Sequence, residues 1–472
     1  MSQHAIGFKM AATMRQYLLC FAQEHVEFRL AELRAITSLL GIKVDLNDPE
    51  YDQMNPFLLL RLPSNSCAHK IMGRTMLGRF MIELWGHGNS WSELHQSLQL
   101  YPDERKAPFS QNADTSFCFR MRTVGKKLGM EEKLAIIEDL VDFLDFKGKV
   151  DLKNPQQVFH IYADYGQTPN KIPDQPYKIY FGRLISEGQR QLEQLYSVKK
   201  RHFIGNTSMD ATLSLLMANQ AQVRPGMVTF DPFVGTGSLL VAAAHFGSYV
   251  LGGDININII HGRGKTSRKG VGQYRGKDEN IRANLRQYGL EHLYLDVLVS
   301  DFSCQVWRVQ PLFDAIITDP PYGIRESTRK IGGSKELTVN EEQEAQHIPP
   351  TTAYHLSDIF TDLLNFSARF LRLHGRLVYW LPVCRAEYTE DQIPHHPCLS
   401  LVANSEQPLS TTIGRRLVTM EKTRHMEGLE GDSPRAEIRD DCYRDHNAIR
   451  EKVFGQNAKD LKMKVMSKTE SR

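Results

Sequence analysis

The sequence is poor in cysteine and has no cysteine pairs at short spacing. Its 472 residues include 7 cysteines, and no two of them form a Cys-x-x-Cys motif. Structural zinc sites and disulfide frameworks require cysteines at short, repeated spacings. We therefore expect free thiols in a reducing compartment and no intrinsic metal site.

Long apolar segments are also absent. No run reaches the roughly 18 apolar residues that a membrane-spanning helix requires. The first residues lack the charged-then-apolar pattern of a secretion signal. We expect a chain that is neither secreted nor embedded in a membrane.

A strong charge of one sign is missing as well. The formal net charge is +3, and the 41% hydrophobic and 24% charged residues are ordinary for a globular protein. A net charge this small does not by itself indicate a polyanionic partner. The chain is too long for one compact core, so two or three domains are expected.

The first part of the chain, residues 16–165, predicts an α+β domain because strand-like and helix-like patterns alternate there. Residues 166–206 begin with several prolines and no apolar periodicity, which predicts a linker, with a long surface loop as the alternative. Residues 426–472 are polar and poor in aromatics, which predicts a loosely ordered tail. The expected strands are 17–21, 57–62, 116–122 and 158–162, and the expected helices are 28–40 and 131–144.

Residues 207–425 predict an α/β fold, a doubly wound and mostly parallel sheet. Apolar strand patterns alternate there with helical ones, as such sheets require. The segment Thr207-Ser208-Met209-Asp210 precedes the first helical pattern and predicts a helix cap. The expected strands are 228–230, 249–253, 295–299, 313–318 and 376–381.

The tetrapeptide Asp319-Pro320-Pro321-Tyr322 directly follows the apolar strand pattern 313–318. In open α/β sheets, ligands bind at the carboxyl ends of the strands. Two consecutive prolines fix φ and remove two N–H donors, so the loop is stiff and its carbonyls can face a ligand. A simple strand terminator is the alternative, which the tetrapeptide alone does not exclude.

A glycine-rich loop follows the first strand of the same region. It reads Asp231-Pro-Phe233-Val-Gly235-Thr-Gly237-Ser and opens a helical pattern. Gly235 and Gly237 allow the backbone to approach a ligand closely. The third glycine of a dinucleotide fingerprint is absent and no Gly-Lys-Ser/Thr follows, so a dinucleotide or P-loop site is disfavoured.

Acidic residues follow the ends of three strands and indicate a cationic ligand. Asp231 stands where a phosphate loop would avoid an anion. Asp254 ends the next strand, where a carboxylate accepts hydrogen bonds from ribose hydroxyls. Asp301 follows the third strand and is assigned to an exocyclic amine of adenine. S-adenosylmethionine, with its sulfonium and ammonium groups, meets these demands, and Phe233, Gly235 and Gly237 are assigned to the same site.

A methyl donor at this edge suggests a task for the tetrapeptide. An exocyclic amine of a base is a weak nucleophile because its lone pair is delocalised into the ring. Hydrogen bonds to the Asp319 carboxylate and the Pro320 carbonyl would orient that amine for direct methyl transfer, while Pro321 stiffens the loop. Tyr322 is placed to stack on the base. We therefore assign all four residues to catalysis.

The two motifs resemble those of the class I S-adenosylmethionine-dependent amino-methyltransferases. The segment Val150-Asp-Leu-Lys-Asn-Pro155 resembles the THUMP domain, an RNA-binding module of tRNA-modifying enzymes. Over roughly residues 16–425 the chain is similar to the eukaryotic tRNA guanosine N2-methyltransferase catalytic subunits that act on the tenth nucleotide of tRNA. Segments 83–88 and 200–210 contribute to this resemblance.

The resemblance implies a tRNA substrate, a cytoplasmic location and a small zinc-binding activator subunit that forms a heterodimer with the chain. Two basic clusters agree with an RNA partner, although a solvated face is the alternative. Methylation of DNA adenine or of a protein amide stays open because these enzymes share the tetrapeptide, and so does a non-catalytic tRNA-binding scaffold. The clusters comprise Arg263, Lys265, Arg268, Lys269, Arg275 and Lys277, and then Arg325, Arg329 and Lys330.

Overall fold

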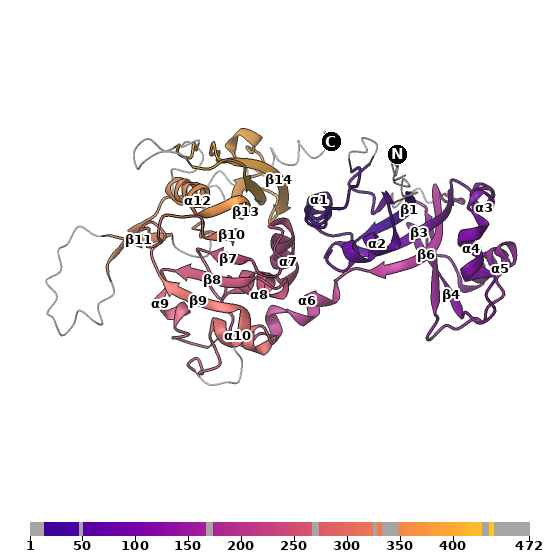
Figure 1. The fold of residues 1–472 in the computed structure, drawn as a ribbon, viewed down its shortest axis with the longest axis horizontal. Coiled ribbons are helices and arrows are strands. Elements are labelled where there is room, and N and C mark those ends of the chain that lie inside the picture. Colours follow the sequence, from indigo (N-terminus) through magenta and orange to yellow (C-terminus); the bar gives the residue numbers. More distant parts are fainter. Residues whose placement is uncertain are drawn as a thin grey trace, which may run out of the picture. The chain divides into compact units, whose positions relative to one another are not determined.

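The computed structural model describes residues 14–46, 51–166, 173–266, 273–323, 328–332, 349–426 and 434–438. The chain forms two compact units, and their described residues come from 1–26 and 37–189 in the first unit and from 27–36 and 190–472 in the second (Figure 1). Within the described ranges, no helix is both long enough and apolar enough to cross a membrane.

The first unit contains a six-stranded sheet with the strand order β2-β1-β3-β6-β5-β4. All neighbouring strands are antiparallel except β4 and β5, which are parallel. The mixture of strands and helices confirms the α+β class predicted for this part of the chain. Its elements are β1 (Arg15–Phe21), β2 (Phe57–Leu62), α2 (Asn65–Met72), β3 (Gly78–Gly88), α3 (Trp91–Leu100), α4 (Asp103–Ser110), β4 (Phe117–Val124), α5 (Met130–Leu144), β5 (Gln157–Asp164) and β6 (Lys178–Glu187).

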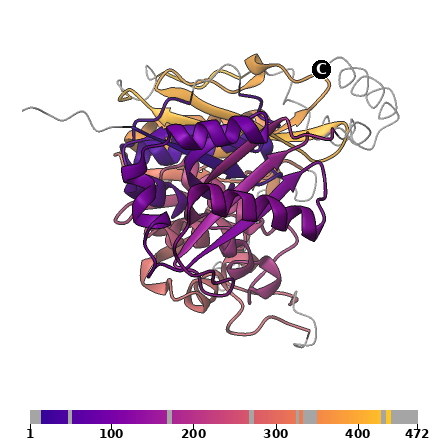
Figure 2. The ribbon, with the colours of Figure 1, turned by 90° about the vertical axis from the view of Figure 1, so that its right-hand side faces the viewer.

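Apolar side chains cover both faces of this sheet. One cluster joins Leu94 and Leu98 of α3 and Leu140 of α5 to aromatic residues of the strands. A second cluster includes Phe57 and Phe80. Figure 2 views this unit from its end, with purple helices in front of the strands. Burying a large apolar side chain contributes about 1.5–3 kcal/mol, so these clusters are the main source of the unit's stability.

The predicted linker 166–206 is wrong in its central part. Residues 178–187 form β6, which pairs with both β3 and β5. The prolines that suggested a linker lie before this strand, and a single apolar run inside a polar segment carries too little periodicity to reveal it.

Residues 27–36 correct the predicted domain 16–165, because they belong to the second unit. They comprise the end of η1 (Val26–Phe28) and most of α1 (Arg29–Leu39). The Phe28 ring lies 6.0 Å from the Trp380 ring, and Asn219 Nδ2 donates to Glu32 Oε1 at 2.7 Å. Such contacts join residues far apart in the sequence, and no local pattern indicates them.

The second unit is built on a seven-stranded sheet with the order β14-β15-β13-β10-β7-β8-β9. A two-stranded ladder, β11-β12, accompanies it. The elements are α6 (Gln191–Leu195), η2 (Val198–Lys200), α7 (Ala211–Gln220), β7 (Val228–Asp231), α8 (Ser238–His245), β8 (Tyr249–Asp254), α9 (Ile257–Ile260), α10 (Ile281–Gln287), η3 (Glu291–Leu293), β9 (Tyr294–Val299), β10 (Phe313–Thr318), β11 (Arg329–Ile331), β12 (Thr351–Ala353), α12 (Leu356–Phe370), β13 (Leu371–Cys384), η4 (Glu390–Gln392), β14 (Leu399–Pro408) and β15 (Ile413–Lys422).

Five strands of this sheet, from β13 to β9, are parallel, which confirms the predicted doubly wound α/β fold. Figure 1 shows α12 and the pair α7 and α8 on opposite sides of the sheet. The prediction did not include β14 and β15, which add an antiparallel edge. Their residues alternate between polar and apolar side chains only irregularly, so the period of two is weak.

The parallel register brings the carboxyl ends of neighbouring strands to one edge. Asp231 ends β7 and pairs with Gly252 of β8, and Asp254 is the last residue of β8. Thr318 ends β10 and pairs with Tyr379 of β13. The glycine-rich loop and the tetrapeptide therefore leave the sheet side by side.

Candidate active site

A cavity of about 610 Å³ lies at this edge of the second unit. Two stretches assigned to the site from the sequence meet in it, the glycine-rich loop and the Asp-Pro-Pro-Tyr tetrapeptide. A third stretch is the segment before α7, for which the sequence predicted only a helix cap. A fourth stretch comes from β15 and the turn before it. The lining residues are Asn206 to Asp210, Leu213, Asp231, Phe233 to Thr236, Ser238, Leu239, Asp319 to Tyr322, Leu409, Ser410, Ile413 and Arg415.

An arginine that the sequence analysis did not select holds the tetrapeptide. Arg415 of β15 donates from Nη1 to Asp319 Oδ2 at 3.2 Å and to the Tyr322 hydroxyl at 3.3 Å. The ion pair is largely buried, with 11% of the arginine side chain and 24% of the aspartate side chain exposed. One guanidinium therefore fixes both polar side chains of the tetrapeptide.

Arg415 is itself held from two further sides. Its Nε donates to Gln407 Oε1 at 2.8 Å, and its guanidinium carbon lies 3.9 Å from the centre of the Trp380 ring. The aromatic ring supplies a cation–π contact, which stabilises a desolvated guanidinium. Nothing in the sequence around Arg415 indicates this role, because its partners lie on β13, β14 and the tetrapeptide.

Asp231 lines the cavity and is 1% exposed. Its Oδ1 accepts from the Thr318 hydroxyl at 2.7 Å and from the Phe233 amide at 3.1 Å. Burial raises the pKa of Asp231 to about 7, and the nearby Asp254 and Asp319 carboxylates add to the rise. A cationic ligand would favour the ionised form of a carboxyl group that has a pKa near 7 and two carboxylates nearby, so Asp231 is suited to bind a cation.

The glycine-rich loop turns tightly and leaves open space above one of its residues. Gly235 has φ +49° and a side chain placed there would meet nothing within 4 Å, whereas its amide donates to Asp254 Oδ2 at 2.9 Å. Gly237 has φ +79° and a Cβ at this position would lie 2.7 Å from Ile281 Cγ2. The first glycine thus lines the cavity, and the second permits the loop to pack before α8.

Three of the residues assigned to donor binding do not line the cavity. Gly237 packs beneath it, and Asp254 contacts the loop through Gly235 and accepts from the Asn256 amide at 2.8 Å. Asp301 lies apart from Asp231: its Oδ1 accepts from Ser303 Oγ at 2.8 Å and its Oδ2 from the Ile331 amide at 2.5 Å. The structure brings Asp231, Phe233 and Gly235 together with the four tetrapeptide residues.

The segment before α7 has the predicted cap and also borders the cavity. Asp210 Oδ1 accepts from the Thr212 amide at 2.8 Å, which confirms the helix cap. Ser208 and Thr236 share a hydrogen bond of 2.6 Å between their hydroxyls, so this segment is tied to the glycine-rich loop. Buried Arg201 donates to Ser238 Oγ at 2.7 Å and supports the start of α8.

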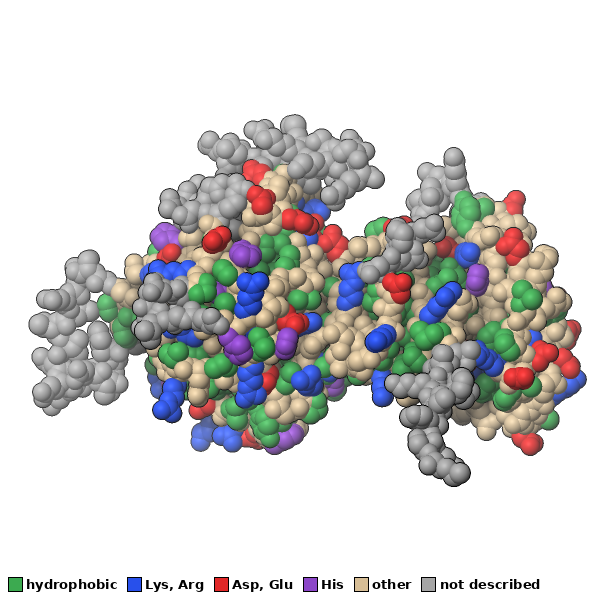
Figure 3. Space-filling view, turned by 45° about the horizontal axis from the view of Figure 1, so that its top comes forward, with side chains coloured by type: hydrophobic (Ala, Val, Ile, Leu, Met, Phe, Trp, Pro, Cys, Tyr) green, Lys and Arg blue, Asp and Glu red, His purple; other side chains and the backbone are tan. Residues whose placement is uncertain are grey.

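Several residues of the basic clusters are engaged within the fold. The Arg275 guanidinium lies 4.8 Å from the Phe203 ring centre, Lys330 lies 3.5 Å from Asp358, and Arg329 donates to Thr351. Arg268, Lys269 and Arg325 lie outside the described residues. On the face drawn in Figure 3, the described Lys and Arg side chains are scattered among acidic and apolar ones. An RNA-binding role for these clusters stays a prediction.

The residues around the cavity fit a cationic, nucleoside-sized ligand. Asp231 and Asp319 face it, Asp254 lies behind the loop, and Arg415 is already paired with Asp319. The acids outnumber the one arginine, so the charge balance favours a cation. Open space at Gly235 allows close approach of such a ligand to the backbone.

Comparisons with known proteins agree with this geometry. The family profile described as "Tmrp11 THUMP N-terminal domain" matches residues 15–190, and the one described as "RMKL-like, methyltransferase domain" matches residues 199–347. The protein named tRNA (guanine(10)-N(2))-methyltransferase TRMT11 of Bos taurus is 53% identical over 442 residues, covering 93% of this chain and 95% of that protein. TRMT11 of Homo sapiens is 52% identical over 449 residues, covering 94% and 96%. The tRNA (guanine(10)-N(2))-methyltransferase of Saccharomyces cerevisiae is 34% identical over 427 residues, covering 86% and 93%.

The sheet order and the matching profile define a class I methyltransferase unit joined to a THUMP-type amino-terminal unit. Identity above one third extends over nearly the whole length of the curated relatives. The chain belongs to the tRNA (guanine(10)-N2)-methyltransferase family. The resemblance predicted from the sequence is thereby confirmed.

Proposed function

We propose that the chain is the catalytic subunit of an enzyme that transfers a methyl group from S-adenosylmethionine to N2 of guanosine at the tenth nucleotide of tRNA. The observation that carries the proposal is the pairing of Asp319 and Tyr322 with Arg415 at a cavity that also contains Asp231 and Gly235. Relatives of this activity that align over nearly the full chain support the same substrate.

The donor would be held by the glycine-rich loop and the surrounding acids. Asp231 supplies a buried carboxylate for the positive end of the donor, and Gly235 leaves room for it beside the loop. Phe233 lines the cavity and offers an aromatic surface. Asp254 and Asp301 are assigned to the ribose and the adenine amine, and Gly237 to the shape of the loop. When bound, S-adenosylmethionine supplies a methyl group on a sulfonium, which an amine nitrogen displaces directly.

The tetrapeptide would orient the guanine amine. Asp319 and the Pro320 carbonyl accept hydrogen bonds from the two amine hydrogens, which turns the nitrogen lone pair toward the methyl group. Pro321 keeps the loop stiff, and Tyr322 stacks on the base. As the bond from nitrogen to the methyl carbon forms, the carbon–sulfur bond of the donor would break, S-adenosylhomocysteine would leave with the electron pair, and the nitrogen would lose one proton. Asp319 is the first acceptor for that proton.

A zinc-binding activator subunit and a cytoplasmic location are part of the proposal. Both come from the family resemblance. Co-expression of the chain with such a subunit should raise its solubility or its methylation rate. No change in either quantity on forming a stable heterodimer would contradict an activating role.

The decisive experiment compares three acceptors with a labelled methyl donor. We expect transfer to unmodified tRNA, with N2-methylguanosine identified by mass spectrometry of the nucleosides, and background transfer to duplex DNA and to protein. Asp319→Ala should lower the turnover number by at least about 100-fold, because orientation and proton acceptance are both lost. Its affinity for the donor should change less than about threefold. Undiminished turnover of Asp319→Ala would contradict a catalytic role for Asp319. A tRNA-binding scaffold would be favoured if the wild-type chain, alone or with its activator subunit, binds the donor but transfers no methyl group.

A further inference from the structure

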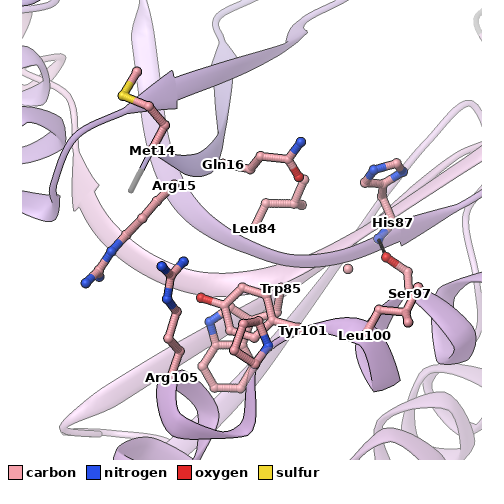
Figure 4. A pocket seen from close by; sticks show the side chains of 12 residues that line it. Met14, Arg15, Gln16, Leu84, Trp85, His87, Ser97, Leu100, Tyr101 and Arg105 are labelled. Carbon is pink, nitrogen blue, oxygen red and sulfur yellow. Dashed lines mark hydrogen bonds between the residues drawn. The ribbon is translucent and has the colours of Figure 1, made fainter. Parts of the chain in front are cut away.

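The first unit contains a second cavity, of about 270 Å³, which the proposed methyl transfer does not use. It lies where β1, β3, α3 and the start of α4 meet. Ligand pockets for drug-sized molecules usually measure roughly 300–1,000 Å³, so this cavity has room for one ligand at the small end of that range. Figure 4 shows Arg15 and Arg105 side by side, the rings of Trp85 and Tyr101 next to them, and His87 and Ser97 farther away.

Two guanidinium groups from different elements reach this cavity. Arg15 of β1 donates to Glu83 Oε1 at 3.1 Å, which fixes its position. The guanidinium of Arg105 on α4 makes no hydrogen bond or ion pair with any described residue. Glu83 also accepts from Arg183 at 2.9 Å and from the Tyr101 hydroxyl at 3.3 Å, so two arginines are paired with this carboxylate while Arg105 has no acidic partner among the described residues. The surplus of positive charge favours an anionic ligand.

The groups that shift the pKa values of Tyr101 and His87 show which charges lie near the cavity. Burial and the Glu83 carboxylate raise the pKa of the Tyr101 hydroxyl, and the guanidinium groups of Arg105 and Arg15 oppose the rise, so both cations act on one hydroxyl. Burial and Lys178 lower the pKa of His87, which is therefore neutral at pH 7. Among the lining residues, Arg15 and Arg105 supply the positive charge, and His87 and Ser97 offer neutral hydrogen-bonding groups.

A buried donor without a partner also belongs to the cavity lining. Trp85 is 2% exposed, and its Nε1 makes no hydrogen bond with the part of the chain that the structure describes. Its ring stacks on Tyr101 at 5.6 Å with an angle of 20° between the planes. Leaving an N–H group buried and unpaired costs roughly 1–3 kcal/mol, so an acceptor atom on a ligand would recover this energy.

We propose that this cavity binds one unpaired nucleotide of the RNA substrate. The phosphate lies against Arg15 and Arg105, and an acceptor atom of the base or ribose takes the Trp85 N–H. A base within a duplex does not present its edges to so small a cavity, whereas an unpaired nucleotide does. The inference rests on the proposed function for its ligand class and extends it by assigning a nucleotide site in the first unit.

Binding of labelled RNA to the full chain tests this site. The probes are a short single-stranded oligonucleotide and the same sequence as a duplex. Arg105→Ala removes no side-chain hydrogen bond or ion pair with a described residue and should weaken single-strand binding about tenfold, with a salt slope lower by about 0.7. Trp85→Phe keeps the stacked ring and should weaken binding about fivefold at an unchanged slope, because the lost donor is neutral. Arg61→Ala, an exposed arginine of β2, is the matched control and should change affinity less than twofold.

Two results would overturn the site. One is an Arg105→Ala variant that binds single-stranded RNA as Arg61→Ala does, and the other is duplex binding that is equally tight and equally sensitive to Arg105→Ala. In the methylation assay, Arg105→Ala should raise KM for tRNA and leave kcat unchanged. A chain that methylates no tRNA refutes the proposed function, whereas the oligonucleotide titration still decides whether the cavity binds RNA.

Discussion

Replacing Arg415 is the most informative perturbation of the active site. Its guanidinium simultaneously contacts Asp319, Tyr322 and Gln407 and lies on the Trp380 ring. Arg415→Ala removes all of these contacts at once, and Arg415→Lys retains the charge without the fork of donors. Both variants leave the residues that contact the substrate unchanged.

The expected magnitude follows from the ion pair. Two unit charges about 3–4 Å apart attract with roughly 4–5 kcal/mol at an effective dielectric constant near 20. Desolvation offsets part of this energy, and a hydrogen bond to a charged group contributes about 1.5–3 kcal/mol net. Because the contact orients Asp319 in the transition state, we expect Arg415→Ala to lose about 2.7 kcal/mol of transition-state stabilisation. This corresponds to a kcat about 100-fold lower, and we expect a loss of about tenfold for Arg415→Lys.

The adjacent Arg416 provides a matched control on the same strand. Its side chain is 13% exposed, against 11% for Arg415, and it donates to Asn404 instead of facing the cavity. Single-turnover methyl transfer to tRNA gives the rate constants, and calorimetry gives the donor Kd. We expect Arg416→Ala to lose stability but keep kcat, and Arg415→Ala to lose kcat with the donor Kd changed less than threefold. A folded Arg415→Ala variant with kcat within threefold of wild type would refute the positioning role.

Two further predictions concern donor binding. Because the pKa of Asp231 in the free protein is about 7 and a cation favours the ionised carboxylate, binding releases a proton at low pH. Donor affinity should rise about tenfold from pH 6 to pH 8 and then level off. The Asp231→Asn variant should not show this rise. A flat profile for the wild-type chain would show that the Asp231 carboxylate does not face the positive charge of the donor. Gly237→Ala should cost about 2 kcal/mol of folding free energy, because of its positive φ and the Ile281 contact, whereas Gly235→Ala should cost about 1 kcal/mol but weaken donor binding more. Thermal denaturation measures the loss of stability and titration measures the loss of donor affinity. A larger stability loss in Gly235→Ala, with weaker donor binding in Gly237→Ala, would contradict the assigned roles.

The local patterns of the sequence predict most strands that lie buried in the parallel sheet. Residues 313–318 form β10 as predicted, since a short β-branched run ended by proline has few alternatives. Strand β3 was missed because its residues are buried on both faces and interrupted by glycine, so no period of two marks it. A glycine likewise interrupts the short apolar run of β6, which follows a polar segment. The placement of residues 27–36 in the second unit depends on Phe28 and Glu32 meeting distant partners, which local periodicity does not encode.

The candidate site was predictable where it coincides with strand ends. Asp231 ends β7 and Asp319 directly follows its parallel neighbour β10, so the register alone brings them to one edge. Arg415 lies within an antiparallel strand that the sequence patterns did not reveal, and a lone arginine in a polar segment carries no signal. The cavity residues Leu409 and Ile413 come from the same hairpin. Sequence motifs thus identify one wall of the cavity, and tertiary structure supplies the other.

The pairing of Asp319 with Arg415 also limits how the amine proton can leave. An adjacent guanidinium stabilises the ionised carboxylate and weakens it as a base. A weak base is sufficient here, because the amine becomes strongly acidic only after its lone pair has begun to bond to the methyl carbon. Asp319 therefore contributes first by orienting the amine and only then by accepting its proton. On this basis Asp319→Asn, which keeps one acceptor oxygen in place, should retain more activity than Asp319→Ala, whereas a carboxylate needed chiefly as a strong base would make the two variants equally inactive.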